Sequence, residues 1–421
     1  MAQVAHSRTT GIAALCVLLV LAGPPTRAAQ NTPPAATAAE PPLTFGVALD
    51  LAITNNLELA AVRRGRAIRQ AHVSTARLWD NPEFSAEITR DTPHGDVAIA
   101  LPVDLGRVRS RRVDLAKEEL VMADVEEAAA LRDLRRKVRL AFYGLLAADE
   151  QVALADGVLT GAERMKEVAQ ARYEEGAAPR LDVMEAELGA IRARADMDLA
   201  RSSRRAVQAD LNALLNRPPG ITLTLAGGSS DLPSFPTMDR ATADAFASNV
   251  DMRAADREAA IEERRLSLLK AERTPVPTFS VGTALNAPGE FNVGAHAGVS
   301  VAIPLFSRNQ GEIAASMATI DLIKARREAI RRQVEANLFS ALERATAQKA
   351  RAESYRTALV PTAVAIQGLA EESYRLGRDS ILTALLAQRA LRDVKSEYLE
   401  ALLALQAAVA DLEDILGAPI T

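Results

Sequence analysis

The sequence predicts a mostly helical protein with a smaller membrane β portion and an internal duplication. Three observations indicate this fold class. Alanine, leucine, arginine and glutamate dominate long stretches with few glycines or prolines, four segments alternate between apolar and small or polar residues, and several short motifs occur twice. The first pattern is typical of long helices with a narrow apolar seam, and the second is typical of strands with two different faces.

The composition excludes several classes of protein. Of the 421 residues, 48% are hydrophobic and 25% are charged, which fits neither a disordered chain nor a bundle of apolar membrane helices. The net charge of −4 gives no indication of nucleic-acid binding. The one cysteine excludes a disulfide framework, and the four histidines do not fall at metal-ligand spacing. Because no nucleophile–base pattern or glycine-rich phosphate loop is present, we expect neither an enzyme nor a bound metal or cofactor.

The first residues have the pattern of a cleaved secretion signal. His6 and Arg8 precede an apolar run over residues 11–23, which is too short to cross a bilayer and is followed by small residues. We predict a signal peptide over residues 1–28. The next segment, residues 29–42, is rich in proline, alanine and threonine and is expected to be a flexible arm. The chain is therefore expected to be exported.

Five short motifs occur twice in the same order, at offsets of 193 to 202 residues. The pairs are Asn56–Leu59 with Asn249–Met252, Asn81–Ser85 with Val276–Ser280, Leu101–Val103 with Ile303–Leu305, Tyr173–Gly176 with Tyr374–Gly377, and Leu214–Asn216 with Ile415–Gly417. Each repeat is expected to contain a helix, two strands, a long helix, a glycine turn and a further helix. The predicted parts are a first repeat over 43–216, a connector over 217–237, a second repeat over 238–417 and a tail over 418–421.

Two predicted strands in each repeat form a hairpin. In the first repeat, one strand follows Pro82 and the other covers residues 97–103. In the second repeat, one strand begins near Phe279 and the other covers residues 293–305. In the last of them valine, alanine, isoleucine and leucine share one face, and glycine, histidine and serine share the other, as is typical of a transmembrane barrel strand. Four strands cannot close a barrel and open edges are not tolerated in lipid, so several chains must combine; three would supply twelve strands. The alternative is a pair of soluble hairpins packed on helices.

The longest predicted helix runs from about Gly106 to Arg172 without a proline. Its apolar residues recur at steps of three and four, which is a heptad seam, and at 1.5 Å per residue it would be on the order of 100 Å long. The seam comprises Leu131, Leu134, Val138, Ala141, Leu145, Ala148, Val152, Ala155 and Leu159, then Leu181, Met184, Leu188, Ile191 and Ala195, and in the second repeat Leu402, Leu405, Val409, Leu412 and Leu416. Gly176 and Gly377 are expected to reverse each long helix into its partner. Such hairpins indicate a tunnel that conducts rather than a catalytic site.

With these features the sequence resembles the TolC-like outer membrane efflux family, over about residues 43–416. The segment Ser307-Arg308-Asn309-Gln310-Gly311 directly follows the last strand. It is similar to the branch of the family paired with heavy-metal pumps of the cobalt–zinc–cadmium type. The residues that carry the resemblance are Asn56 and Asn249 in the first helix of each half, Tyr173 and Gly176, Tyr374 and Gly377, and Ser307-Arg308-Asn309-Gln310-Gly311.

The resemblance implies a homotrimer with a twelve-stranded β-barrel in the outer membrane lipid and a helical α-barrel tunnel in the periplasm of a Gram-negative bacterium. It also implies that the helical tips dock a periplasmic adaptor (membrane fusion) protein, which is coupled to an inner-membrane pump of the RND type. Heavy-metal cations are the expected substrates. The alternatives are an outer membrane duct for drug efflux or type I protein secretion, and a secreted coiled-coil structural protein without a barrel.

The resemblance also supplies candidate residues for the tunnel entrance, because the family narrows it with acidic residues beyond the tip turn. Asp182 and Glu185 follow Gly176, and their spacing of three places both carboxylates on one helix face. In a trimer they would form rings that admit cations. Thr383 and Leu386, at the equivalent positions of the second repeat, carry no carboxylate. The alternative is a solvated first helical turn favoured by the helix dipole.

The remaining candidates have structural or docking roles. Tyr173, Gly176, Tyr374 and Gly377 mark the two tip turns, which are expected to dock the adaptor. The residues Arg308, Asn309, Gln310 and Gly311 follow a strand and open a helix, so a strand-to-helix junction is expected there rather than a metal contact.

Overall fold

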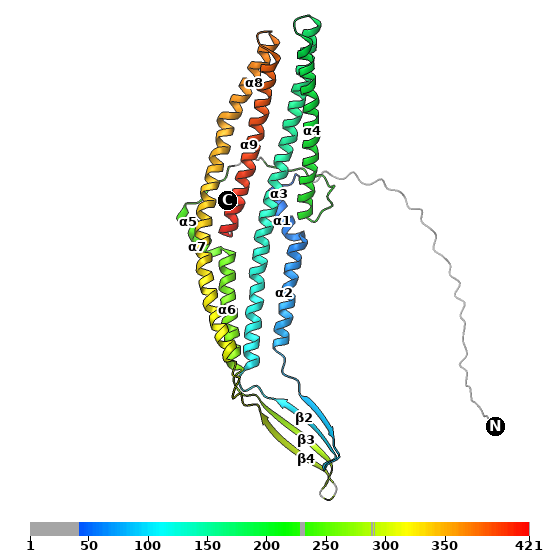
Figure 1. Cartoon of the computed structure of the whole chain (residues 1–421), viewed down its shortest axis with the longest axis vertical. Helices are drawn as coiled ribbons and strands as arrows, with labels where there is room; N and C mark the ends of the chain where they lie inside the picture. Colours follow the sequence, from blue (N-terminus) through cyan, green and yellow to red (C-terminus); the bar gives the residue numbers. More distant parts are fainter. Residues whose placement is uncertain (1–41, 228–231, 288, 290, 421) are drawn as a thin grey trace, which may run out of the picture. The chain divides into compact units, whose positions relative to one another are not determined.

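The computed structural model describes residues 42–227, 232–287, 289 and 291–420 (Figure 1). The predicted signal peptide and nearly all of the predicted arm lie outside these residues. The elements are α1 (Phe45–Asn55), α2 (Leu57–Ala76), β1 (Glu83–Ile88), β2 (Gly95–Pro102), α3 (Val108–Glu174), α4 (Arg180–Leu214), α5 (Met238–Ser248), α6 (Val250–Ala271), β3 (Pro277–Ala287), β4 (Phe291–Val301), α7 (Gln310–Ser354), the π-helical turn η1 (Tyr355–Leu359), α8 (Val360–Arg375) and α9 (Ile381–Leu416).

The two halves of the chain repeat one order of elements, and the predicted class of long helices with a four-stranded sheet is confirmed. The strands lie at one end of the helices, and the α3–α4 and α8–α9 turns lie at the other (Figure 1). The 67-residue α3 is one continuous helix, whereas its counterpart is divided into α7, η1 and α8. Pro361 is the second residue of α8, and because proline has no N–H, it cannot donate a hydrogen bond to the preceding turn.

The first predicted helix of each half is two helices, and the asparagine stands between them. Asn56 ends α1 and caps α2, because its Oδ1 accepts a hydrogen bond from Leu59 N at 3.0 Å. Asn249 caps α6 in the same way, accepting from Met252 N at 3.1 Å. The two side-chain amides donate to the last turns of α4 and α9, respectively. Each asparagine therefore fixes a helix break and joins it to the end of its own repeat.

The four strands form one antiparallel sheet in the order β1-β2-β3-β4. Within the described residues, β1 and β4 each have a neighbour on one side only. The strand predicted to reach Leu305 ends at Val301. Pro304 lies just beyond that end and has no N–H for a sheet hydrogen bond.

Apolar contacts are spread along the helices in several clusters instead of one central core. The predicted seam of α9 is buried throughout, with Leu405 and Leu412 inaccessible to solvent. The predicted seam of α4 is different, because four of its side chains are exposed: Leu181, Met184, Leu188 and Ile191. The α4 stripe is therefore only partly covered within the described chain. None of the described helices is by itself long and apolar enough to cross a membrane, and α1 with α2 passes that criterion only as a pair bent by 43°.

We expect Gly417→Ala to destabilise the fold by about 2–4 kcal/mol. Gly417 ends α9 in the left-handed region at φ +70°, and an added Cβ would lie 2.6 Å from the Ser248 carbonyl oxygen. Gly176→Ala is the matched control, because φ is +73° there but no atom lies within 4 Å of the added Cβ. The control should lose only about 1 kcal/mol from backbone strain. Thermal unfolding of the two variants separates these costs, and equal losses would contradict the packing argument.

Candidate functional site

The two tip turns have the same backbone geometry. In the first, Ala177 N donates to Arg172 O at 2.7 Å and Gly176 N donates to Tyr173 O at 3.0 Å. The second repeats both hydrogen bonds around Gly377, which has a φ of +71°. This is the Schellman motif, in which a glycine in the left-handed region ends the helix and satisfies its last carbonyls. This conformation favours glycine at both turns.

The tips of the two repeats are joined by a cluster that we call the tip clasp: Arg172, Asp182 and Tyr374. Tyr374 is only 1% exposed, and its hydroxyl donates to an Asp182 carboxylate oxygen at 3.3 Å. The guanidinium of Arg172 lies 4.6 Å from the Tyr374 ring centre and donates to the Tyr374 carbonyl oxygen at 2.5 Å. Burial, and then the charge of Asp182, raise the pKa of Tyr374, so its hydroxyl keeps the proton that it donates.

The predicted tip residues therefore differ in their surroundings. Tyr173 is 42% exposed, while its counterpart Tyr374 is buried between the hairpins. Asp182 contacts the other hairpin, and Glu185 lines a groove of about 410 Å³ between α4 and α9. Asp379, near the second tip turn, accepts a hydrogen bond from Thr383 of its own hairpin at 2.9 Å. The structure thus brings Asp182 together with Tyr374, which the sequence did not pair.

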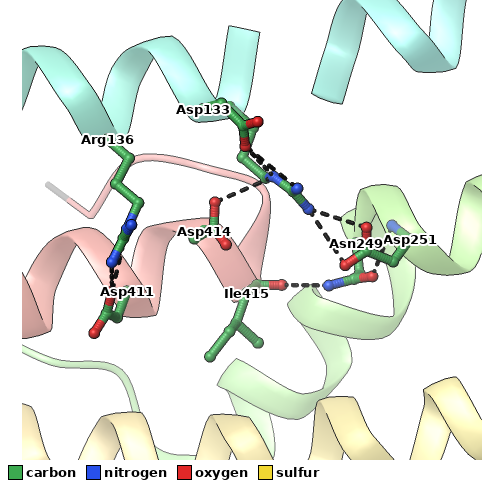
Figure 2. Close-up of polar contacts among 8 residues, drawn as sticks. Asp133, Arg136, Asn249, Asp251, Asp411, Asp414 and Ile415 are labelled. Atoms are coloured by element: carbon green, nitrogen blue, oxygen red, sulfur yellow. Dashed lines mark hydrogen bonds and ion pairs between the residues drawn. The ribbon is translucent and has the colours of Figure 1, made fainter. Parts of the chain in front are cut away.

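A second polar cluster joins the repeats farther from the tips (Figure 2). Arg132 of α3 lies 3.1 Å from Asp414 of α9 and 3.2 Å from Asp251 of α6. One turn along α3, Arg136 pairs with Asp411 at 2.7 Å. Burial raises the pKa of the Asp414 carboxyl above its ordinary value, which Arg132 opposes. These ion pairs hold the long helix of the first repeat against the second repeat.

The sheet has one apolar and one polar face, as the sequence predicted. The register places Phe84, Ile99, Val281 and Ala297 on a common face, which is largely exposed; Ile88 at its outer edge is 92% exposed. The opposite face carries small and polar residues. These are Glu83, Ser85, Glu87, Asp96, Ala98, Ala100, Thr278, Ser280, Gly282, Ala284, Gly294, His296, Gly298 and Ser300.

The polar face of the sheet is acidic, with one histidine that lies beside an aspartate. The imidazole Nδ1 of His296 lies 3.6 Å from an Asp96 carboxylate oxygen. The ring occupies the space above Gly282, where an added Cβ would come within 2.7 Å of it. No group of three described histidine, cysteine or acidic side chains is arranged to hold a metal ion. The face therefore carries negative charge without forming a metal centre.

The motif from Arg308 to Gly311 lies between β4 and α7. The Gln310 side chain accepts from Arg308 N at 2.7 Å and donates to Phe306 O at 3.0 Å. Asn309 is in the left-handed region at φ 54°, and its amide lies 3.4 Å from the Leu269 carbonyl at the end of α6. These hydrogen bonds turn the chain from strand to helix and join that turn to α6.

Sequence reasoning missed the basic residues that join the repeats. Arg172 and Arg139 each contact residues more than 200 positions away. The helical pattern placed neither residue opposite a partner, because periodicity shows which face of a helix is buried and not what covers it. The only available signal was an arginine within or next to an apolar seam.

Long helical hairpins joined to a sheet with an exposed apolar face define a class of outer membrane channel proteins. Residues 48–217, which lie within the predicted first repeat and its connector, match the family described as outer membrane efflux protein. This match covers 170 of the 421 residues, so the chain is similar to the family over its first half. Together with the relatives described next, which match along most of the chain, it identifies an efflux channel of the outer membrane, with its helical portion in the periplasm.

Two relatives and one solved structure illustrate the similarity. The cobalt-zinc-cadmium resistance protein CzcC of Cupriavidus metallidurans is 28% identical over 382 residues, covering 89% of this chain and 90% of the relative. The nickel-cobalt-cadmium resistance protein NccC of Alcaligenes xylosoxydans xylosoxydans is 25% identical, covering 71% and 68%. The outer membrane protein VceC of Vibrio cholerae shares the fold at a TM-score of 0.71 and 16% identity, covering 90% of this chain and 97% of that one.

Proposed function

We propose that three copies of this chain form an outer membrane channel that conducts heavy-metal cations. The helical tips dock a periplasmic adaptor protein, which couples the channel to an inner-membrane pump. The observation that carries the proposal is the sheet, with an exposed apolar face and two open edges at β1 and β4. Lipid tolerates neither open edge, so each must pair with another copy, and three copies supply twelve strands.

The exposed α4 stripe supports the assembly of several copies. Leu181, Met184, Leu188 and Ile191 recur at helical spacing and are only partly covered within the described chain. Apolar side chains at this spacing pack well against another helix. A neighbouring copy in the trimer would bury the stripe.

The cationic substrate is supported by the charge of the polar sheet face and by the relatives. Glu83, Glu87 and Asp96 share the face that would line the barrel, and acidic residues in a pore favour cations. The relatives CzcC and NccC are named for resistance to cobalt and cadmium, together with zinc or nickel. We assign this chain the same class of substrate.

Cysteine cross-linking tests the assembly, because the one cysteine, Cys16, lies in the predicted signal peptide. Ser85→Cys on β1 is combined in turn with single cysteines along β4. We expect disulfide-linked trimers for the matching register. The control combines Ser85→Cys with Ser280→Cys, because β3 already has strands on both sides. Trimers with the control, or no linked chains with any β4 position, would contradict the closure of the barrel.

Deletion of the gene tests the substrate. We expect the deletion strain to become sensitive to cobalt, zinc, cadmium or nickel, and the wild-type gene to restore resistance. A panel of hydrophobic drugs and an assay for secreted protein are measured in parallel. Sensitivity to drugs alone, or loss of secretion alone, would assign the channel to the alternative kind of pump or secretion system.

A further inference from the structure

The strands and helices meet in four short segments that contact one another. They cover residues 77–82, 103–112, 270–275 and 302–311. The first two meet where Arg109 donates to the Arg77 carbonyl oxygen at 2.9 Å. The second and third meet at Gly106, where an added Cβ would lie 2.9 Å from the Ala271 carbonyl oxygen. The fourth joins the end of α6 through Asn309. We call these four segments the junction collar.

The junction collar is strongly basic. It contains eight basic and three acidic residues. The basic ones are Arg77, Arg107, Arg109, Arg111, Arg112, Lys270, Arg273 and Arg308. Among the residues that the structure describes, the side chains of Arg77, Arg107 and Arg273 are exposed and make no hydrogen bond or ion pair. Because these three charges are not used within the fold, they are available to a ligand of negative charge.

Exposed apolar side chains accompany these charges. Phe306 is 92% exposed and Trp79 is 66% exposed, with the Arg109 guanidinium 3.9 Å from the Trp79 ring centre. Leu105 and Ile303 are exposed as well. Ile303 lies two residues beyond the end of β4, so the apolar face of the sheet runs on into the collar. A surface that joins aromatic and aliphatic side chains to unpaired arginines suits the boundary between acyl chains and phosphate headgroups.

We propose that the junction collar binds anionic phospholipid, with the arginines on headgroup phosphates and the aromatic side chains among the upper acyl carbons. The proposal rests on the outer membrane placement of the sheet, which puts the collar at the leaflet facing the periplasm. The ligand is lipid and not a second copy of the chain, because a second copy would bring the same positive charges to the contact. The collar then anchors the channel at a fixed depth and prefers phosphatidylglycerol over phosphatidylethanolamine.

Trp79 is the only tryptophan of the chain and reports on the collar directly. The full-length protein is reconstituted in phosphatidylethanolamine vesicles that contain an equal small fraction of either brominated phosphatidylglycerol or brominated phosphatidylethanolamine. Bromine quenches tryptophan fluorescence at short range. We expect stronger quenching by the brominated phosphatidylglycerol. The triple variant Arg77→Gln, Arg107→Gln and Arg273→Gln should weaken this preference by at least about fivefold.

The matched control replaces three exposed arginines away from the collar, Arg201→Gln, Arg205→Gln and Arg253→Gln, which changes the net charge equally. It should keep the preference. The proposal would be overturned by equal quenching with both lipids or by an unchanged preference in the collar variant. Quenching by neither lipid would overturn it as well, because another chain would then cover Trp79. Conductance across the same vesicles tests the channel itself. An intact conductance with no lipid preference would refute the collar proposal and leave the proposed channel standing.

Discussion

Replacement of Arg172 by alanine is expected to raise the single-channel conductance of the protein in a planar bilayer. The tip clasp is the direct polar link between the two hairpin tips, and Arg172 contributes both a hydrogen bond to the Tyr374 carbonyl and the contact with the Tyr374 ring. Their loss should cost about 2 kcal/mol per protomer. This would shift an equilibrium between closed and open tips about thirtyfold toward the open form.

Two further variants test whether the conductance follows the contacts of the tip clasp. Tyr374→Phe keeps the ring under Arg172 and removes only the 3.3 Å hydrogen bond to Asp182, so its conductance should rise less. Arg375→Ala is the control, because this exposed arginine pairs with Glu372 on its own helix and joins no second hairpin. If Arg172→Ala conducts like the wild-type protein while folding normally, the clasp does not hold the tips together.

The sequence predicted those parts of the fold that depend on local patterns. The steps of three and four in α9 predicted its buried face, and a glycine in the left-handed region was correctly expected at each tip turn. The period of two along the strands predicted which residues share a face of the sheet. Each of these features is encoded within a few neighbouring residues, so no knowledge of the partner segment was needed.

Contacts between distant segments could not be predicted in this way. Asn56 was placed inside a helix because helical residues flank it on both sides, although asparagine is a good helix cap. The exposed stripe of α4 has the same spacing as the buried seam of α9, and only the arrangement of the helices distinguishes them. The link from Tyr374 to Asp182 spans 192 positions, and no periodicity identifies such a pair.

Replacement of Glu413 by alanine is expected to destabilise the protein more than any exposed ion-pair change. Glu413 of α9 accepts from Arg139 of α3 at 2.7 Å, and the two side chains are only 15% and 10% exposed. It also accepts from the backbone N–H of Ile420 at 2.9 Å. The Arg139 guanidinium has a second side-chain acceptor, Gln406, and lies 4.7 Å from the Phe45 ring centre. Loss of the carboxylate would leave a buried positive charge poorly compensated, at a cost of about 3–5 kcal/mol.

Thermal unfolding of three variants separates the buried charge from simple loss of a contact. Glu372→Ala, which breaks an exposed pair with Arg375, should leave the stability nearly unchanged, because solvent screens exposed ion pairs. The double variant Arg139→Met with Glu413→Leu should recover much of the stability lost in Glu413→Ala, because it removes both charges and keeps the volume. A double variant as unstable as Glu413→Ala would show that the ion pair holds the repeats together through its geometry. Recovery would show instead that the buried arginine makes the single change costly, and that apolar packing between α3 and α9 can join the repeats by itself.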